Sequence, residues 1–253
     1  MSYGCVVVAR NLEDVASELR RLPNCKIVDG PRTLNECRNL GASRLQTDLI
    51  AFIDDDNRLA TDALEEMAKA FYDSSVGAVS PLIFDGNGSV WFAGMRWNPL
   101  GIALISRRTP KHSLLLTEGF HNVFMVKREA FEKAGGFDAK RFPFYLGEAD
   151  LAERMKRLGY VFLVAKNAKV WHGIGRGLAR GSHIRSDERA YLVGRNRLLF
   201  LKLHKSLGTY IAHVILILPF LAAYHILGMV SQRKYGFVKN YLRGIKDGLM
   251  GRF

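Results

Sequence analysis

The chain has 253 residues, 48% of them hydrophobic, and a formal net charge of +13. This length can bury a full core, and the hydrophobic content excludes a disordered protein. The three cysteines (Cys5, Cys25 and Cys37) have no metal-type spacing, and their odd number indicates a reducing compartment. The first residues show neither a basic leader nor a long apolar run, so we expect no secretory signal.

The positive charge is concentrated in the last third of the chain. Residues 1–175 hold 23 Lys and Arg against 21 Asp and Glu, a net charge of +2. Residues 176–253 hold 14 Lys and Arg against 3 Asp and Glu, a net charge of +11. We therefore expect an anionic partner for the C-terminal part, either a membrane surface or nucleic acid.

The first 56 residues alternate between strand and helix patterns. Apolar runs at 3–9, 25–28 and 48–53 predict buried strands. Helical spacing of apolar residues at 11–22 and 33–46 predicts the helices between them. A β-α-β-α-β order predicts an α/β fold with a mostly parallel sheet and helices on both faces.

The third of these strands ends in three consecutive acids, Asp54, Asp55 and Asp56. Carboxylates so close together repel one another unless a cation lies among them, and Mg²⁺ and Mn²⁺ prefer oxygen ligands. Because alternate residues of an extended chain point the same way, Asp54 and Asp56 can face one ion together. Open α/β sheets bind ligands at this end of their strands. The alternative is that the acids cap the helix expected from Thr61.

The elements expected between residue 57 and residue 205 are shorter. They are helices at 61–71, 127–134, 151–158 and 187–204, strands at 76–84, 123–126, 161–165 and 168–171, and a hairpin or meander at 90–105.

An apolar run covers residues 211–230, which as a helix of about 30 Å is long enough to cross a bilayer core. His213, Pro219 and His225 interrupt the run, and both its flanks are basic. These features favour a re-entrant or interfacial helix pair bent at Pro219 over a spanning helix. Apolar residues then recur at helical spacing from 238 to 249 with basic residues between them, which predicts an amphipathic helix on anionic lipid. The alternative is a surface helix pair packed on the rest of the protein.

Seven short motifs follow one another along the chain. They are Asp29-Gly30, Arg38-Asn39-Leu40-Gly41, Phe52-Ile53-Asp54-Asp55-Asp56, Phe131-Glu132-Lys133-Ala134-Gly135-Gly136-Phe137-Asp138, Gly147-Glu148-Ala149-Asp150-Leu151, Val170-Trp171-His172 and Arg195-Asn196. In this order and spacing, over about residues 5–205, the chain resembles the family 2 glycosyltransferases. The closing Gly244-Ile245-Lys246-Asp247-Gly248-Leu249 is similar to the ends of rhamnosyltransferase-like members.

The resemblance implies a Rossmann-like GT-A catalytic domain at 1–205, with a nucleotide-sugar and metal half at 1–100 and an acceptor half at 101–205. Residues 206–253 would then form the membrane-associated helices. It further implies an inverting mechanism, a nucleotide-diphosphate sugar donor and Mn²⁺ or Mg²⁺ as cofactor.

The resemblance also assigns metal and donor residues. Asp54 and Asp56 match the DxD pair and would bind the metal with His172, whose imidazole mildly favours Mn²⁺. Asp29 matches the position that reads the donor's base. Its carboxylate suits uracil or thymine, and guanine also offers a partner, so UDP-, dTDP- and GDP-linked sugars all remain open. The expected donor-binding residues are Ala9, Asn11, Asp29, Arg38, Asn39, Asp54, Asp55, Arg176 and Arg180.

Inverting transfer needs one general base to deprotonate the acceptor. In the family this base lies in an acidic pair at the start of a helix, and here Gly147 replaces the first acid. Either Glu148 or Asp150 can serve, and we favour Glu148. The alternative is that both acids only stabilise the positive end of the helix dipole.

The loop at 173–181 is rich in glycine and arginine, and we expect it to close over the donor with Arg176 and Arg180 on the diphosphate. A solvated loop is the alternative. The Gln-x-x-Arg-Trp pattern of processive synthases is absent after His172, which favours the addition of one sugar or few.

Together these features predict a membrane-associated, metal-dependent glycosyltransferase at the cytoplasmic face of the membrane. It would transfer a single sugar to a lipid-linked or cell-surface glycan acceptor. One alternative is a metal-dependent nuclease or phosphotransferase with a nucleic-acid-binding C-terminus. The apolar run and the lack of a nucleic-acid motif argue against it, so we expect no nucleic-acid partner. The other alternative is a catalytically silent membrane scaffold of the same fold.

Overall fold

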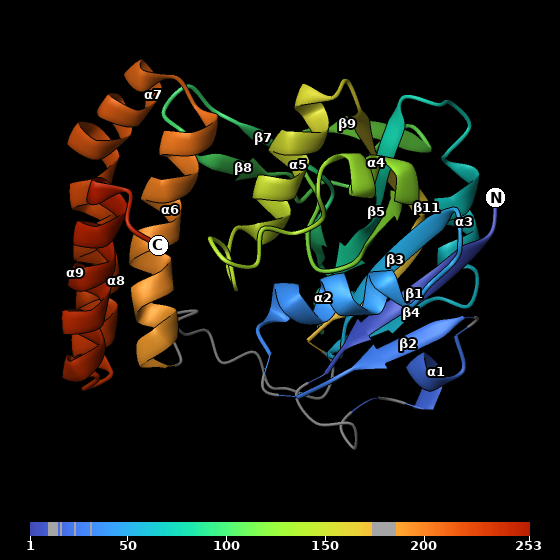
Figure 1. Ribbon diagram of the computed structural model, residues 1–253, viewed down its shortest axis with the longest axis horizontal. Helices are drawn as coiled ribbons and strands as arrows, with labels where there is room; N and C mark the ends of the chain where they lie inside the picture. The colour runs from blue at the N-terminus through green and yellow to red at the C-terminus, as the bar shows by residue number, and fades with distance from the viewer. Residues whose placement is uncertain (10–14, 16, 23, 31, 174–185) are drawn as a thin grey trace.

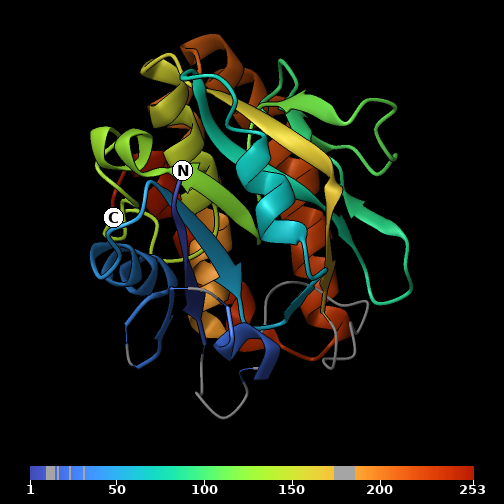
Figure 2. The same ribbon diagram turned by 90° about the vertical axis from the view of Figure 1, so that its right-hand side faces the viewer.

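The computed structural model describes residues 1–9, 15, 17–22, 24–30, 32–173 and 186–253. A nine-stranded sheet forms its centre, and a two-stranded ribbon lies beside it (Figures 1 and 2). The strands of the large sheet are β1 (Tyr3–Val8), β2 (Cys25–Val28), β3 (Leu49–Asp54), β4 (Asn57–Leu59), β5 (Val76–Phe84), β6 (Val90–Phe92), β9 (Leu114–Thr117), β10 (Phe124–Lys127) and β11 (Val161–His172). The ribbon consists of β7 (Met95–Trp97) and β8 (Ala103–Ile105).

The strand order across the large sheet is β2-β1-β3-β10-β5-β11-β4, with β6 paired to β5 and β9 to β11. Strands β2, β1 and β3 are mutually parallel, and β5 is parallel to β11. Between these two groups β10 runs antiparallel to both of its neighbours. The prediction of an α/β fold with a mostly parallel sheet is confirmed.

The sheet is covered by helices α1 (Ser17–Arg20), α2 (Leu34–Ser43), α3 (Ala63–Lys69), α4 (Arg128–Lys133) and α5 (Gly147–Arg157). Strand β3 shows why both faces are buried, since neighbouring residues of a strand point to opposite faces. Ile53 belongs to one core cluster with Met67 of α3. Phe52 belongs to the other, where its ring centroid lies 5.3 Å from those of Phe124 and Phe137.

The end of the chain is helical and comprises α6 (Asp187–His204), α7 (Leu207–Ala212), a π-helical segment η2 (His213–Ile217), α8 (Leu218–Ser231) and α9 (Tyr235–Met250). The segments α7, η2 and α8 form one continuous helix, Leu207–Ser231, instead of the pair bent at Pro219 that we expected. Proline lacks the N–H that an α-helix needs, and the π-helical turn that ends at Ile217, two residues before Pro219, accommodates this loss without a break.

Helix Leu207–Ser231 is the one helix in the described residues that is long and apolar enough to cross a membrane, and 6% of its most apolar window is buried. Helix α9 packs along α6 beside it (Figure 1). The two helices approach closely because a Cβ atom on Gly194 or Gly244 would overlap a backbone carbonyl of the facing helix.

Three other segments differ from expectation. The acids lead directly into β4, which pairs with the end of β11, so a strand separates them from α3. The two strands expected at 161–171 are one strand, with a register shift between Ala165 and Lys169. Helix α5 begins at Gly147, four residues before the expected start, so Glu148 lies in its first turn.

Candidate active site

Arg38 lies at the centre of the candidate site. Thr33 and Glu36 form a capping box that starts α2, and this helix presents Arg38 to the end of β3. The Arg38 guanidinium donates to Asp54 Oδ1 at 2.9 Å and to Glu148 Oε1 at 2.7 Å. Its side chain is 1% exposed. One arginine therefore joins the acidic cluster after β3 to the first turn of α5.

This arrangement shifts the pKa values of the two acids in opposite directions. Burial raises the pKa of Asp54 to about 6, against the lowering effect of Arg38. Burial also acts to raise the pKa of Glu148, but the charges of Arg38 and His121 outweigh it, and the net pKa lies below the usual value. The shorter Arg38 contact is the one to Glu148, so the geometry agrees with an ionised Glu148.

A carboxylate and an imidazole meet beside this group. Asp56 Oδ1 lies 3.4 Å from His172 Nδ1, which also lies 2.8 Å from Asn122 Nδ2. Next to Asp56, the side-chain oxygen of Asn57 is buried without a hydrogen-bond partner. Oxygen and imidazole ligands of this kind suit Mn²⁺ or Mg²⁺.

In the described part of the chain no group of three or more His, Cys, Asp and Glu residues is placed to hold a metal. The expected third ligand, Asp54, has its Oδ1 on Arg38. The residues that fit a divalent cation are thus Asp56 and His172, and the rest of its coordination would come from a ligand or water.

Comparison with known proteins decides the family. The sequence model of glycosyl transferase family 2 matches residues 9–135, half of the chain. The chain belongs to glycosyl transferase family 2. A comparison with the sequences of curated proteins finds no significant match.

Solved glycosyltransferase structures share the GT-A fold. One is a mannosyltransferase from Pyrobaculum calidifontis, solved with GDP-Man and Mn²⁺, which has 14% sequence identity and a TM-score of 0.55. The match covers 98% of this chain and 87% of the mannosyltransferase chain. Staphylococcus aureus TarS has 12% identity and a TM-score of 0.50, covering 100% and 93%. GalNAc-T7, solved with UDP, GalNAc and Mn²⁺, has 14% sequence identity and a TM-score of 0.55. The match covers 68% of this chain but only 44% of the GalNAc-T7 chain. At these identities the likeness establishes the fold alone.

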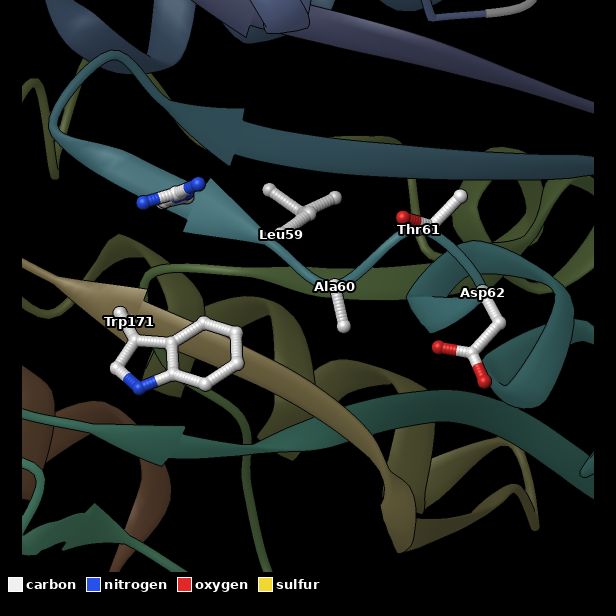
Figure 3. Close-up of a pocket in the computed structure, with 6 residues that line it drawn as sticks. Leu59, Ala60, Thr61, Asp62 and Trp171 are labelled. Carbon is white, nitrogen blue, oxygen red and sulfur yellow. The ribbon is translucent and has the colours of Figure 1, made fainter.

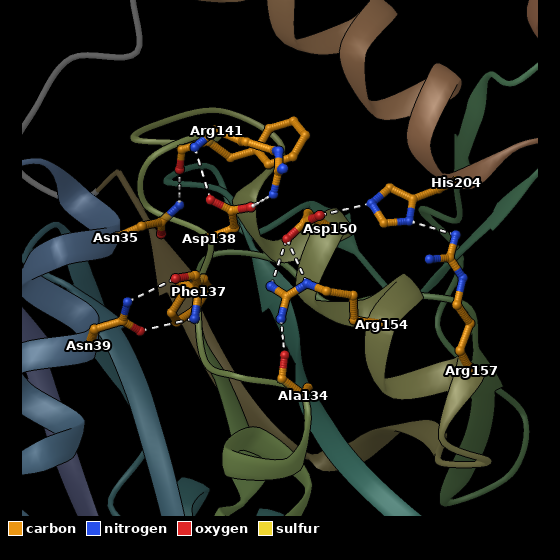
Figure 4. A network of polar contacts seen from close by, with 11 residues as sticks. Asn35, Asn39, Ala134, Phe137, Asp138, Arg141, Asp150, Arg154, Arg157 and His204 are labelled. Carbon is orange, nitrogen blue, oxygen red and sulfur yellow. Dashed lines mark hydrogen bonds and ion pairs between the residues drawn. The ribbon is translucent and has the colours of Figure 1, made fainter. Parts of the chain in front are cut away.

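In this family 2 chain, Glu148 and Asp150 have different surroundings. Figure 4 shows Asp150 among Arg154 and His204, with Arg154 Nη2 2.6 Å from Asp150 Oδ2 and His204 Nε2 2.8 Å from Asp150 Oδ1. Arg157 Nη2 lies 3.0 Å from His204 Nδ1, and since arginine only donates, Nδ1 accepts and Nε2 carries the hydrogen. Asp150 thus ties α5 to the end of α6, whereas Glu148 faces Arg38.

The structure explains why glycine stands at position 147, where the family motif has an acid. A Cβ atom on Gly147 would overlap the side-chain nitrogen of Asn35, which is 1% exposed. Asn35 donates to Phe142 O and accepts from Arg38 Nη1 at 3.3 Å. The space of the missing acid is therefore filled by a side chain that supports Arg38.

The other predicted donor residues lie in different surroundings. Ala9 is buried and its amide donates to Val28 O, which brings it beside Asp29 at the end of β2. The Asn39 amide is engaged by both backbone groups of Phe137 at 2.9 Å, so it anchors this loop (Figure 4). Asp55 is half-buried in the turn before β4. Three predicted residues lie outside the described part of the chain: Asn11, Arg176 and Arg180.

Two parts of the site were not predicted from the sequence. Trp91 packs against His172 and His121, with ring centroids 4.9 and 5.1 Å apart. Asn196 donates to the carbonyls of Phe144 and Tyr145, both at 2.8 Å, and so holds the segment before Glu148. The Arg195-Asn196 motif indicated its importance, but no local pattern indicated its partner.

A hollow of about 700 Å³ lies beside β4 and β11. Figure 3 shows Trp171 and Asp62 on its walls. Because Trp171 precedes His172 in an extended strand, its ring points to the other face of β11. None of the predicted site residues lines this hollow.

Proposed function

We propose that the chain is a membrane-associated inverting glycosyltransferase that moves a single sugar from a nucleotide-diphosphate donor to a lipid-linked or cell-surface glycan acceptor. The observation that carries the proposal is the bridge from Glu148 through Arg38 to Asp54, with Asp56 and His172 beside it. Glu148 as the candidate base, the Arg38 guanidinium, and Asp56 with His172 as candidate metal ligands thus lie together. They lie at the end of the sheet where α/β proteins bind ligands.

The donor would bind at the ends of β1, β2 and β3, with Asp29 toward its base and Asp54 and Asp55 toward its sugar and diphosphate. Mn²⁺ or Mg²⁺ held by Asp56 and His172 would supply Lewis-acid stabilisation of the leaving nucleoside diphosphate. The mannosyltransferase and GalNAc-T7 structures support this donor class because their ligands are GDP-Man and UDP, each with Mn²⁺. UDP-, dTDP- and GDP-linked sugars are all compatible with a carboxylate at Asp29.

Glu148 would act as the general base. An acceptor oxygen attacks the anomeric carbon while the bond from that carbon to the diphosphate oxygen breaks, and the acceptor proton moves to Glu148. A carboxylate with a lowered pKa is ionised at neutral pH and ready to accept it. Arg38 would hold this carboxylate in place.

The membrane proposal rests on the surface of Leu207–Ser231. Phe220, Tyr224 and Leu227 are 77%, 70% and 67% exposed, and Ile215 and Leu216 are more than half exposed. An apolar surface of this kind is costly in water. The apolar residues Val238, Tyr241 and Ile245 of α9 pack on α6 instead of facing lipid as expected, but its basic residues Lys239, Arg243 and Lys246 are exposed. With these and the basic flanks of the helix, the exposed apolar surface suits the cytoplasmic face of an anionic membrane, where it would hold the catalytic domain near a lipid-linked acceptor.

A donor screen tests the catalytic proposal. Purified protein with Mn²⁺ or Mg²⁺ is incubated with UDP-, dTDP- and GDP-sugars, and release of the nucleoside diphosphate is measured. We expect one base to be preferred and chelation of the metal to abolish turnover. Cleavage of labelled DNA or RNA without sugar-nucleotide turnover would instead support the nuclease alternative. Absence of turnover and of donor binding in every combination would support the silent scaffold.

Vesicle co-sedimentation tests the membrane proposal. A double substitution, Phe220→Glu with Leu227→Glu, places two charges on the exposed apolar face. It should weaken binding to anionic vesicles more than roughly tenfold, because each side chain contributes about 1.5–3 kcal/mol when buried. The control is Leu116→Glu, which charges an apolar residue of similar exposure (70%) on β9. Equal vesicle binding by all three proteins would refute the proposal.

A further inference from the structure

A second cavity, of about 230 Å³, lies between the β7–β8 ribbon, the segment before α5 and α6. Its walls include Trp97, Ala103, Ile105, Tyr145, Leu146 and Arg197. We propose that this cavity is the acceptor subsite and that it binds the phosphate end of a polyprenyl-type lipid phosphate, whose monoanionic form carries the one proton that Glu148 would take as the phosphate oxygen attacks. The inference rests on the proposed transferase function and specifies its acceptor.

The cavity wall continues directly into the proposed base. Leu146 is the N-cap of α5, and its Cα lies at most about 7.6 Å from that of Glu148, two residues along the chain. Tyr145 and Leu146 both have left-handed backbones, with φ of 57° and 67°. Such conformations are costly for these residues and persist where the surroundings impose them, here through the Asn196 hydrogen bonds.

The walls combine an apolar surface with one cation. Trp97 stacks on Phe200 at a centroid distance of 4.8 Å, and the aliphatic Ala103 and Ile105 complete this side. Arg197 donates to Tyr145 Oη at 3.1 Å and, in the described residues, has no ion-pair partner. A guanidinium without a carboxylate in an apolar wall suits a phosphate that carries a hydrocarbon chain.

One wall of the cavity, at Gly101, lies against the start of the proposed membrane helix. The ribbon packs on the start of the apolar helix, since His213 Nδ1 lies 2.7 Å from Leu100 O and a Cβ on Gly101 would contact Thr209 and His213. Figure 1 shows β7 and β8 beside α7 and the upper end of α6. Ile105, which lines the cavity, is 42% exposed, and Ile211 on the helix is 46% exposed. The hydrocarbon chain of the lipid would leave the cavity on this side, toward the apolar helix.

A free sugar acceptor fits this cavity less well. Its hydroxyl groups need several polar partners when they leave water. The polar side-chain groups of the walls are the Trp97 indole N–H, the Tyr145 hydroxyl and the Arg197 guanidinium, and the last two already bond to each other. The walls therefore favour a hydrocarbon chain ending in an anion.

Equilibrium binding of farnesyl monophosphate to the whole chain tests the proposal. No metal is added, so that no metal ion can join the probe to Asp56 and His172. Farnesol and inorganic phosphate are compared as the apolar and the anionic part alone. Ala103→Phe places a phenyl ring in the cavity, and Leu104→Phe places the same ring on the other face of the strand. Arg197→Gln removes the cation, and Arg96→Gln removes an exposed one from the same ribbon. Nucleotide-sugar binding with Mn²⁺ is measured in every variant.

We expect farnesyl monophosphate to bind roughly tenfold or more tightly than either part alone, and Ala103→Phe and Arg197→Gln each to weaken it by at least tenfold. Leu104→Phe and Arg96→Gln should stay within about twofold of the original protein. Donor binding should persist in all four variants, which separates a wrong acceptor subsite from a wrong transferase assignment. Arg197→Gln leaves the packed walls of the cavity intact, so it tests the proposal even if Ala103→Phe does not fold. Unchanged binding of farnesyl monophosphate by Arg197→Gln would overturn the proposal.

Discussion

Asn35 on α2 occupies the space that a side chain on Gly147 would need. Asn35 is held there by Phe142 O and by Arg38, so it cannot move aside without disturbing the bridge to Glu148. We predict that Gly147→Ala destabilises the protein by about 1–3 kcal/mol, although alanine favours helices over glycine. Urea unfolding and the rate of sugar transfer measure the two effects.

The double variant Asn35→Ala with Gly147→Ala provides the matched test of this overlap. Its cost should be clearly below the sum of the two single costs, because the first substitution makes room for the second. Gly86→Ala, where a Cβ atom meets nothing within 4 Å, serves as the control and should change stability by about 0.5 kcal/mol or less. Strict additivity would show that Gly147 is not limited by Asn35.

Glu148 and Asp150 should respond differently to loss of charge. We predict that Glu148→Gln lowers the single-turnover transfer rate by about 10²–10⁴-fold and leaves donor affinity within about twofold. Asp150→Asn should instead cost about 3 kcal/mol of stability, because its side chain is 4% exposed and Arg154 and His204 lose their anion. A larger loss of rate in folded Asp150→Asn than in Glu148→Gln would assign the base to Asp150.

Arg38→Gln should change the pH dependence of the reaction. Burial acts to raise the pKa of Glu148 and Arg38 more than offsets it, so the folded-state pKa lies below the unfolded one. Glu148 therefore contributes stability above its unfolded pKa, and this contribution is lost as the pH falls through the folded pKa. Without Arg38 the burial effect remains, so the acidic limb of the transfer rate should move to higher pH.

The same variant should lose about 3 kcal/mol of stability at neutral pH, because two largely buried carboxylates lose their partner. Arg243→Gln removes an arginine that is 72% exposed and paired to Asp247, and it should leave both the profile and the stability unchanged. An acidic limb that stays in place in Arg38→Gln would mean that Glu148 is not the group that titrates.

The strand ends could be predicted from sequence because hydrophobic runs and acids at their ends are local patterns. The parallel pairing of β1, β2 and β3 followed from the alternation of strands and helices. The placement of Asp56 beside His172 depended on a family resemblance, since 116 positions separate them and no local rule joins them. Short strands β4 and β9 were missed because three or four residues carry too little periodicity.

The hydrogen bonds and ion pairs that hold the site residues in place could not be predicted from the sequence. Arg38 was expected on the donor, yet its guanidinium joins two acids from distant segments, which only the folded packing decides. Asn196 likewise acts through carbonyl groups about fifty residues earlier in the chain. The unbroken course of helix Leu207–Ser231 includes a π-helical turn, which composition does not reveal.

The three residues expected to hold the metal should not contribute equally. We predict that Asp56→Asn and His172→Gln each raise the Mn²⁺ concentration for half-maximal activity by roughly tenfold or more. Asp54→Asn should raise it less, because Asp54 is bound to Arg38, and should mainly lower the transfer rate. The exposed Asp62→Asn is the control. A metal requirement most sensitive to Asp54 would restore the three-ligand site expected from the motif.

The contact between α6 and α9 should be as important for activity as for stability. A Cβ atom on Gly244 would overlap the carbonyl oxygen of Tyr191, so Gly244→Ala forces the helices apart and should cost about 1–3 kcal/mol. On Gly228 in α8 a Cβ atom meets nothing within 4 Å, so Gly228→Ala should be neutral or stabilising by up to about 1 kcal/mol.

Since Asn196 on α6 holds the backbone before Glu148, separation of the helices should also slow sugar transfer by folded Gly244→Ala. Urea unfolding and single-turnover rates at a temperature where both variants are folded compare the pair. Equal stability and equal rates in Gly244→Ala and Gly228→Ala would mean that α9 neither packs closely on α6 nor influences the segment before Glu148.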